Sequence, residues 1–338
     1  MCSAHSLHKP LLDFILAANI IAQALTNATH PLIISLYLGR NPRAVPVLVS
    51  LSEHLAIPVY ASCPDSVLFP MTHPHFVGLA YGGHNPWLLN ADVILVIDSD
   101  IPWIPVFNSP SKNARIFHLD LDVLKPTMGM FHIDAEIRAR VDSELALQAI
   151  LLALESLPLH HELVATRRSR ITAAHDAWIA ELEKLETATP SSTITLPYLF
   201  SRLREGVPAK TLYLNEAISN YILAWAPMRP ARPGAASMSG AAALGWGLGA
   251  VIGLSLRKAA VPGTNDNDLT VLVVSDGTFL FCIPSAAYWI ARQYQTVSSP
   301  HRILWASSLT QFLGLQPFLT IVLNNGGWRV CLLSPPRL

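Results

Sequence analysis

The chain has 338 residues, of which 51% are apolar and 14% charged, and its 23 basic residues balance 23 acidic ones. A neutral chain offers no bulk charge to a nucleic acid or an acidic membrane surface, so we expect neither partner. The length suits two domains of ordinary size. The cysteines form no CxxC pair and have no histidine at zinc spacing, which favours a reducing, intracellular setting. They are Cys2, Cys63, Cys282 and Cys331.

Two apolar segments, Phe14–Leu25 and Gly240–Leu254, could be mistaken for membrane signals. Asp13 precedes the first, which lacks an obvious small-residue cleavage site. The second is rich in glycine and shorter than a typical span. We expect both to be buried helices of a soluble protein.

The first 155 residues alternate between helical and strand-like segments. The run at 92–97, DVILVI, is continuously apolar and ends at Asp98-Ser99-Asp100, as is typical of a strand buried on both faces. Alternating strands and helices predict a parallel, doubly wound sheet. In chain order we expect a helix at 19–25, a strand at 31–36, a helix at 45–55, strands at 58–62, 92–97 and 114–119, and a helix at 143–154.

Residues 156–196 are more polar and helical in character, then rich in threonine and serine, which indicates a linker. A second α/β region occupies 197–338, with its regular pattern starting near Lys210. In this region we expect a strand at 269–274, a helix at 286–294 and a strand at 318–323.

Polar clusters follow both strands of the second region: Ser275-Asp276-Gly277-Thr278 after the first, and Asn324-Asn325-Gly326-Gly327 after the second. Taken separately, each cluster is typical of a turn. Together they predict a ligand site, because the carboxyl ends of neighbouring parallel strands share the edge where open α/β sheets bind ligands. A carboxylate beside an amide oxygen suits Mg²⁺, which takes few protein oxygens. Gly277 allows close approach to a phosphate, and Thr278 can donate at the following helix start.

Asp276-Gly277-Thr278 followed by Asn324-Asn325 resembles the signature of thiamine-diphosphate-dependent enzymes of the acetolactate synthase, benzoylformate decarboxylase and pyruvate decarboxylase type. The resemblance implies that Asp276, Asn325 and the carbonyl of Gly327 bind Mg²⁺. One position departs from the pattern, since the family's leading glycine is Ser275 here.

Further segments resemble the family in the same order along the chain. In the segment at 240–253, GAAALGWGLGAVIG, Leu244 matches the bulky residue that bends the cofactor, and Ala242 matches the carbonyl that meets the pyrimidine amine. The turn at 215–219 resembles the first diphosphate-contacting turn, with Ser219 as the expected contact.

Residues 1–155 correspond by resemblance to the family's central domain, on the motifs YLGRNPRAV and ADVILVIDSD. The implied fold is α/β, with two doubly wound parallel-sheet domains, the second incomplete. The implied cofactors are thiamine diphosphate and Mg²⁺. The implied substrate is a small 2-oxo acid, cleaved or joined by a lyase or transferase, in a homo-oligomer (dimer or tetramer) of the cytoplasm or mitochondrion. FAD occurs in some relatives, but no residue here supports it.

The chain also departs from a working family member. Asp276 and Asn325 are 49 positions apart, and removing 297–316 would restore a spacing close to the family's, so we expect an unspliced intron or an insertion there. The cofactor domain is expected to be truncated after Arg329. The resemblance also places a pyrimidine-binding domain, with its catalytic glutamate, ahead of this chain. We therefore assign no catalytic residue and expect a fragment with little or no turnover alone.

Two other classes stay open. One is a catalytically silent homologue that forms a subunit or binding module. The other is a nicotinamide or flavin oxidoreductase, for which the glycines at 245, 247, 249 and 253 would form a dinucleotide fingerprint. That fingerprint must directly follow a strand, and the residues before Gly245 do not read as one. His73 and His75 are interpreted as loop or core residues rather than metal ligands.

Overall fold

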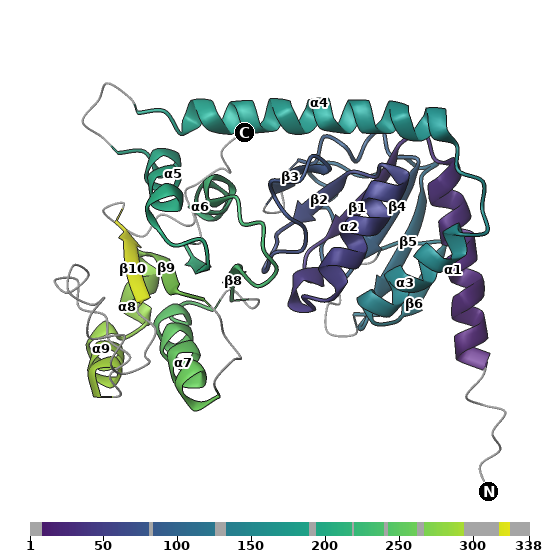
Figure 1. Ribbon diagram of the computed structural model, residues 1–338. Coiled ribbons are helices and arrows are strands. Elements are labelled where there is room, and N and C mark those ends of the chain that lie inside the picture. The colour runs from purple at the N-terminus through teal and green to yellow at the C-terminus, as the bar shows by residue number, and fades with distance from the viewer. Residues whose placement is uncertain are drawn as a thin grey trace, which may run out of the picture. The chain divides into compact units, whose positions relative to one another are not determined.

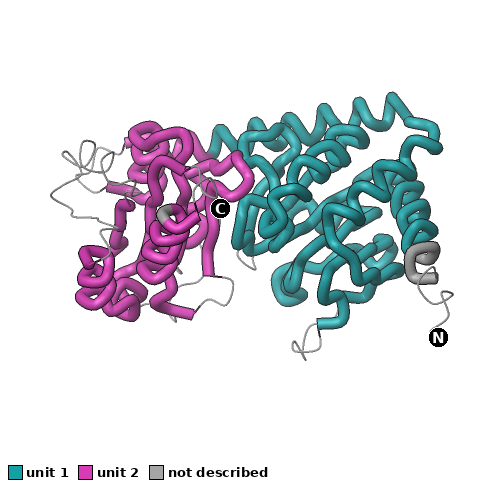
Figure 2. The backbone as a smooth tube through the Cα atoms, turned by 60° about the horizontal axis from the view of Figure 1, so that its bottom comes forward, with its two compact units in different colours: residues 1–181 teal, residues 182–338 magenta. Residues whose placement is uncertain are grey.

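The computed structural model describes residues 9–80, 84–125, 133–188, 194–217, 220–239, 243–261, 267–293 and 318–324. The chain divides into two compact units, residues 1–181 and 182–338, which Figure 2 colours separately. Each unit is built on a sheet in which all neighbouring strands run parallel. The α/β class predicted from the alternation of strands and helices is therefore confirmed, and the second sheet is the smaller one among the described residues.

The first unit contains a six-stranded sheet in the order β3-β2-β1-β4-β5-β6 (Figure 1). Strands β1, β2 and β4 are buried along their whole length, which the continuous apolar run predicts for β4. The strands are β1 (Pro31–Ser35), β2 (Val59–Ser62), β3 (Phe76–Ala80), β4 (Val93–Ile97), β5 (Arg115–Asp120) and β6 (Ile137–Arg140).

Helices pack against this sheet. Helices α1 (Lys9–Asn27), α2 (Ala44–Leu55) and α3 (Ser143–Leu154) lie side by side (Figure 1). Successive residues of β1 point to opposite faces of the sheet. Leu32 and Ile34 share one face and belong to a core cluster with Ile171 of α4 (His161–Leu185). A short 3-10 helix, η1 (Leu38–Arg40), follows β1.

Helix α4 is fastened to the first unit by Arg167, whose side chain is buried. Its guanidinium donates to the carbonyl of Leu55 at the end of α2 and to the carbonyls of Thr26 and Ala28 at the end of α1. These carbonyls are the acceptors that helix ends leave unsatisfied. The amino-terminal part of α4 is therefore an integral part of the first unit.

The second unit contains a four-stranded sheet in the order β10-β9-β7-β8. One core cluster joins Leu214, Leu272 and Phe318 of this sheet to Val251 of α7 and Ala291 of α9. The elements are α5 (Leu196–Gly206), β7 (Thr211–Glu216), α6 (Tyr221–Met228), β8 (Ala236–Met238), α7 (Gly247–Ala260), β9 (Leu269–Ser275), α8 (Asp276–Phe281), α9 (Pro284–Gln293) and β10 (Phe318–Leu323).

Several elements differ from the sequence predictions. Strands β3, β6, β7 and β8 were not individually expected: β3 contains Gly78 at a φ of 131°, and β6 is a half-exposed edge strand. Helix α1 begins earlier than predicted, at Lys9, and α7 runs from Gly247 to Ala260. The segment 297–316 lies outside the described residues.

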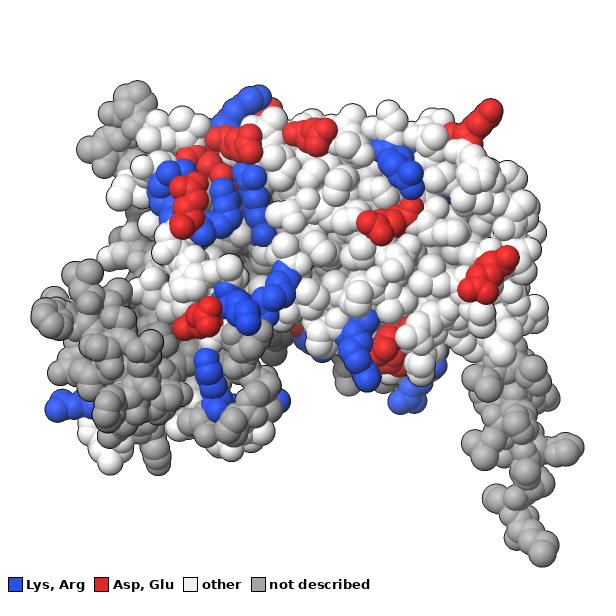
Figure 3. Space-filling view, viewed as in Figure 1, with Lys and Arg blue, Asp and Glu red and all other residues white. Residues whose placement is uncertain are grey.

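The described surface mixes both signs of charge. Basic and acidic side chains lie beside one another on the face shown in Figure 3. No helix within the described ranges combines the length and hydrophobicity that a bilayer crossing requires.

Candidate functional site

The carboxyl ends of three strands meet at one edge of the second sheet. Ser275, the last residue of β9, pairs with Leu323, the last residue of β10. Glu216, the last residue of β7, pairs with Val274 on the other side of β9. The prediction that the two polar clusters follow neighbouring parallel strands is confirmed for β9 and β10. Asn325 and Gly327 lie outside the described residues.

Asp276 opens α8 directly at this edge, and it is half-buried. The backbone N–H of Gly277 donates to its Oδ1 at 2.9 Å. Within the described part of the chain, no lysine or arginine forms an ion pair with Asp276. The oxygens of the Asp276 carboxylate are therefore not used by a basic side chain of the described residues, and they can bind a metal ion.

The Ser275–Thr278 turn is closed by its two hydroxyl groups, whose oxygens are 2.7 Å apart. Thr278 is buried, and Ser275 has a φ of −78° and a ψ of 164°. Any residue adopts this extended conformation. Serine therefore replaces the family's glycine here without backbone strain.

Glu216 is the residue at this edge that sequence reasoning did not single out. It is 2% exposed, and its carboxylate accepts three backbone N–H groups at the start of α7. Oε1 accepts from Gly245 at 2.8 Å and Trp246 at 3.0 Å, and Oε2 accepts from Gly247 at 2.8 Å. Burial raises the pKa of the Glu216 carboxyl, and the three N–H donors oppose that rise. A glutamate at the end of the strand at 211–216 marks the position in the sequence, but nothing in the sequence indicates its backbone partners.

This arrangement weighs against the dinucleotide interpretation of the glycines. A dinucleotide fingerprint requires free N–H groups at the start of its helix to bind a pyrophosphate. At the start of α7 a carboxylate of the chain itself already accepts the N–H groups of Gly245, Trp246 and Gly247. The start of α7 is therefore closed to an anionic ligand.

The glycines at 245 and 247 serve close packing instead. Gly245 has a φ of 95°, and a Cβ there would stand 2.6 Å from the carbonyl oxygen of Phe281. A Cβ on Gly247 would stand 2.8 Å from Glu216 Oε2. Leu244 precedes this tight segment and is 38% exposed. Ala242, the other residue predicted here, lies outside the described residues.

The turn after β7 is shaped by Asn215, which is fully buried. Its Oδ1 accepts from the N–H of Ala217 at 3.0 Å, and its Nδ2 donates to the carbonyl of Tyr221 at 3.3 Å. The side chain thereby joins the end of β7 to the start of α6, and Ser219 lies outside the described residues.

The carboxyl edge of the first sheet also carries charge, but there the charges are paired. Lys125 Nζ lies 2.7 Å from Asp100 Oδ1 and 2.6 Å from Asp120 Oδ2. Burial would raise the pKa of Asp120, but nearby His118 and the hydrogen bonds from the Asp122 amide and Lys125 hold that pKa well below its usual range. Arg40 pairs with Asp65 at the same edge.

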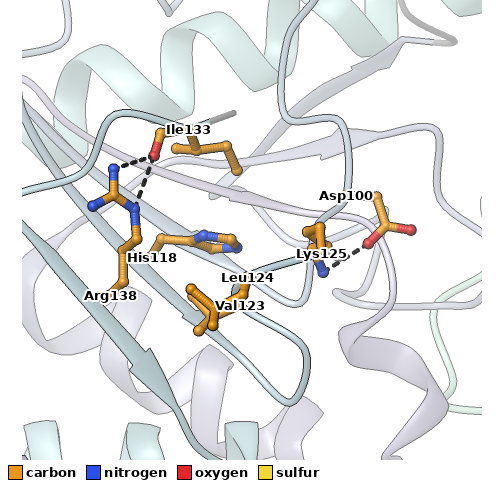
Figure 4. A pocket seen from close by; sticks show the side chains of 7 residues that line it. All are labelled: Asp100, His118, Val123, Leu124, Lys125, Ile133 and Arg138. Carbon is orange, nitrogen blue, oxygen red and sulfur yellow. Dashed lines mark hydrogen bonds and ion pairs between the residues drawn. The ribbon is translucent and has the colours of Figure 1, made fainter. Parts of the chain in front are cut away.

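Figure 4 shows a small cavity beside these ion pairs, lined in part by His118, Lys125 and Arg138. Its volume is about 50 Å³. A cavity of that size accommodates water molecules rather than a flavin.

His73 and His75 have structural partners, as their interpretation as loop or core residues implies. His75 Nδ1 lies 2.9 Å from the hydroxyl of Ser52, and His73 Nε2 lies 3.1 Å from Glu53 Oε1. Burial, with help from His73, lowers the pKa of His75 to about 4. His75 is therefore neutral near pH 7.

Comparisons with known proteins found a family model that matches within the first unit and solved structures with a similar fold. The family model described as "Thiamine pyrophosphate enzyme, central domain" matches residues 18–150. A thiamine diphosphate-dependent 4-hydroxybenzoylformate decarboxylase from Rhodococcus jostii RHA1 has a similar structure, with a TM-score of 0.63, 21% identity and coverage of 93% of this chain and 52% of that one. The benzoylformate decarboxylase from Polynucleobacter necessarius also has a similar structure. Its TM-score is 0.65 and its sequence identity 17%, and the match covers 92% of this chain and 64% of that one. The chain thus spans less than two thirds of the length of either protein, and these likenesses concern the fold.

Proposed function

Through residues 18–150 the chain belongs to the thiamine pyrophosphate enzyme family, and from this premise we propose that its second unit binds thiamine diphosphate together with Mg²⁺. The observation that carries the proposal is Asp276. It is a half-buried carboxylate at the carboxyl edge of β9, beside the end of β10, and it has no basic partner among the described residues.

The donor set fits the proposed ion. In this proposal Asp276, Asn325 and the Gly327 carbonyl supply oxygen ligands, which Mg²⁺ prefers. The described residues hold no cluster of three or more His, Cys, Asp or Glu side chains, as a site built from protein ligands alone would need. Mg²⁺ tolerates a small protein contribution because phosphate oxygens and water complete its octahedron.

The rest of the cofactor is assigned to neighbouring residues. Gly277, Thr278 and Ser219 would contact the diphosphate, the Ala242 carbonyl would meet the aminopyrimidine, and Leu244 would support the bent cofactor. When bound, thiamine diphosphate supplies a nucleophilic carbon and accepts the negative charge left by carbon–carbon bond cleavage. These residues bind and orient it. The proposed reaction class is cleavage or formation of a carbon–carbon bond next to a 2-oxo group, by a lyase or transferase acting as a homo-oligomer.

Calorimetry on the full chain tests the proposal. The wild-type protein should bind thiamine diphosphate with heat that depends on Mg²⁺, and Asp276→Asn should weaken binding ~100-fold, because it removes a charged ligand. Asp268→Asn is the matched control, since Asp268 is exposed at the opposite end of β9. Equal affinity of D276N and the wild-type protein would contradict the proposed site.

A turnover assay separates an enzyme from a catalytically silent homologue. Carbon dioxide release from pyruvate or benzoylformate by the cofactor-loaded chain would favour the lyase. Tight binding without turnover would favour the silent, subunit-forming homologue instead.

A further inference from the structure

We infer that Glu216 is a positioning residue for the proposed cofactor: its carboxylate holds segment 243–247, which carries Leu244, on the sheet edge that carries Asp276. The inference rests on the proposed function and adds a residue that the family signature did not point to. Glu216 itself is too buried to contact a ligand, so its effect passes through the segment.

The contacts show how firmly the segment is held. Both carboxylate oxygens of Glu216 are used, and together they satisfy three successive N–H groups at 2.8 to 3.0 Å. Helix starts leave such N–H groups without partners inside the helix. Hydrogen bonds to an ionised acceptor are about twice as strong as neutral ones. The segment before α7 is therefore fixed to the end of β7 and not only to its own helix.

The same carboxylate joins this segment to the helix that begins at Asp276. Gly245 packs against the carbonyl of Phe281, the last residue of α8. Cys282 Sγ, one residue further, lies 4.0 Å from Glu216 Oε2. Glu216 thus supports the end of β7, the start of α7 and the end of α8 at one point.

The choice of a charged group favours positioning over simple core filling. A buried carboxylate loses its hydration, and an apolar side chain of similar size often gives equal or greater stability. A carboxylate, however, is an acceptor-only group that can receive several N–H groups at once. A carboxylate at a 2% exposed position is therefore explained if ligand binding requires residues 245–247 to be held in this geometry.

The test compares Glu216→Gln with the wild-type chain, using two ligands. Glutamine keeps one oxygen acceptor, but its NH₂ group would face an N–H donor. The ligands are Mg²⁺ with thiamine diphosphate and Mg²⁺ with inorganic pyrophosphate. If Glu216 positions the segment under the ring portion, E216Q should weaken thiamine diphosphate binding ~10-fold and leave pyrophosphate binding within about 2-fold.

Hydrogen exchange without any ligand supplies a second readout. The N–H groups of residues 245–247 should exchange about 10-fold faster in E216Q than in the wild-type protein. Glu205→Gln is the matched control: Glu205 belongs to the same unit but pairs with Arg202 at an exposed position on α5, and its loss should change neither readout.

The outcomes separate the two proposals. A wild-type protein that binds neither ligand would overturn the proposed function. Wild-type binding of both, with an unchanged affinity ratio and unchanged exchange in E216Q, would overturn only the role of Glu216. Equal weakening of thiamine diphosphate and pyrophosphate binding in E216Q would also overturn the role of Glu216, because a general loss of structure would weaken the binding of both ligands alike.

Discussion

At the carboxyl edge of the first sheet, two acidic residues, Asp100 and Asp120, share one basic partner, Lys125. At the corresponding edge of the second sheet, Glu216 is neutralised by backbone N–H groups. Asp276 has no basic partner among the described residues of that edge. Both edges follow the same parallel topology, yet their charges are satisfied differently.

The difference indicates that the edge of the second sheet is the one that keeps a carboxylate, Asp276, available for a ligand. A carboxylate already paired with lysine contributes to stability and has little left to bind a metal ion. A carboxylate that faces no cation is costly to the fold and is retained where a ligand completes it. Changes at the first edge should therefore affect stability, whereas changes at the second edge should affect binding.

The largest expected effect comes from Lys125→Met in the first unit. The Lys125 side chain is 10% exposed, and its removal leaves the neighbouring carboxylates of Asp100 and Asp120 without their shared cation. We expect a loss of about 3–5 kcal/mol in the free energy of unfolding of this unit. Hydrogen exchange of the β1 and β4 amides measures it. Lys112→Met, at an exposed position, is the control, and a K125M loss no larger than the control's would contradict the comparison.

Asp98→Asn should instead stabilise the first unit. Burial raises the pKa of Asp98 from 3.8 to about 6, with Asp120 and Asp142 adding to the rise and Ser143 and Lys125 opposing it. Because the folded-state pKa is raised, this group's contribution is fully present below about pH 4 and is lost as the pH rises through 6. The advantage of D98N should therefore grow between pH 4 and 6, by at most about 3 kcal/mol.

Asparagine also suits the backbone at this position, since Asp98 has a φ of 45° and asparagine tolerates that region. Urea titrations at pH 4 and pH 7.5 measure the effect, and the pH 4 value serves as the internal control. An advantage that is the same at both values would show that burial of the charge is not its cause.

Two alanine substitutions in α7 probe the second edge. A Cβ at Gly247 would meet Glu216 Oε2 at 2.8 Å and Leu272 Cδ1 at 2.6 Å, so Gly247→Ala should destabilise the second unit by about 1–3 kcal/mol. Gly249, one half-turn later, has open space around it. Gly249→Ala should gain about 0.5–1 kcal/mol from helix propensity. Thermal unfolding distinguishes them, and similar shifts in both variants would contradict the packing described.

A smaller effect than that of Gly247→Ala is expected from Ser275→Gly, which introduces the glycine of the family signature. It removes the hydroxyl contact to Thr278 and loosens the backbone, so a loss of about 1 kcal/mol is expected. Thiamine diphosphate affinity should stay within about 2-fold, because the extended backbone at this position suits either residue. A large change in affinity would mean that the serine matters to the ligand.

The sequence was informative where burial was continuous. The strands at 92–97 and 269–274 were predictable because both of their faces are largely covered, which favours a nearly unbroken apolar run. The strand at 318–323 was predictable from its apolar residues, although its middle residues are half-buried or exposed. β6 was not predictable, since its four residues alternate between half-buried and exposed.

The place of Asp276 and Thr278 at the sheet edge could be predicted from their position after a buried strand. The role of Glu216 could not, because its partners are backbone N–H groups that carry no side-chain signature. Only the folded arrangement of β7, β9 and α7 brings them to its carboxylate.

The bonds of Glu216 join residues 29 to 31 positions apart in the chain. Contacts between distant residues form only after the intervening loop has closed, and here that closure requires β7 and α7 to be in place. We therefore expect the start of α7 to consolidate late during refolding. A nascent or partially denatured chain would form its sheet before the segment at 243–247 becomes fixed in place. During refolding, ligand binding should therefore appear later than secondary structure.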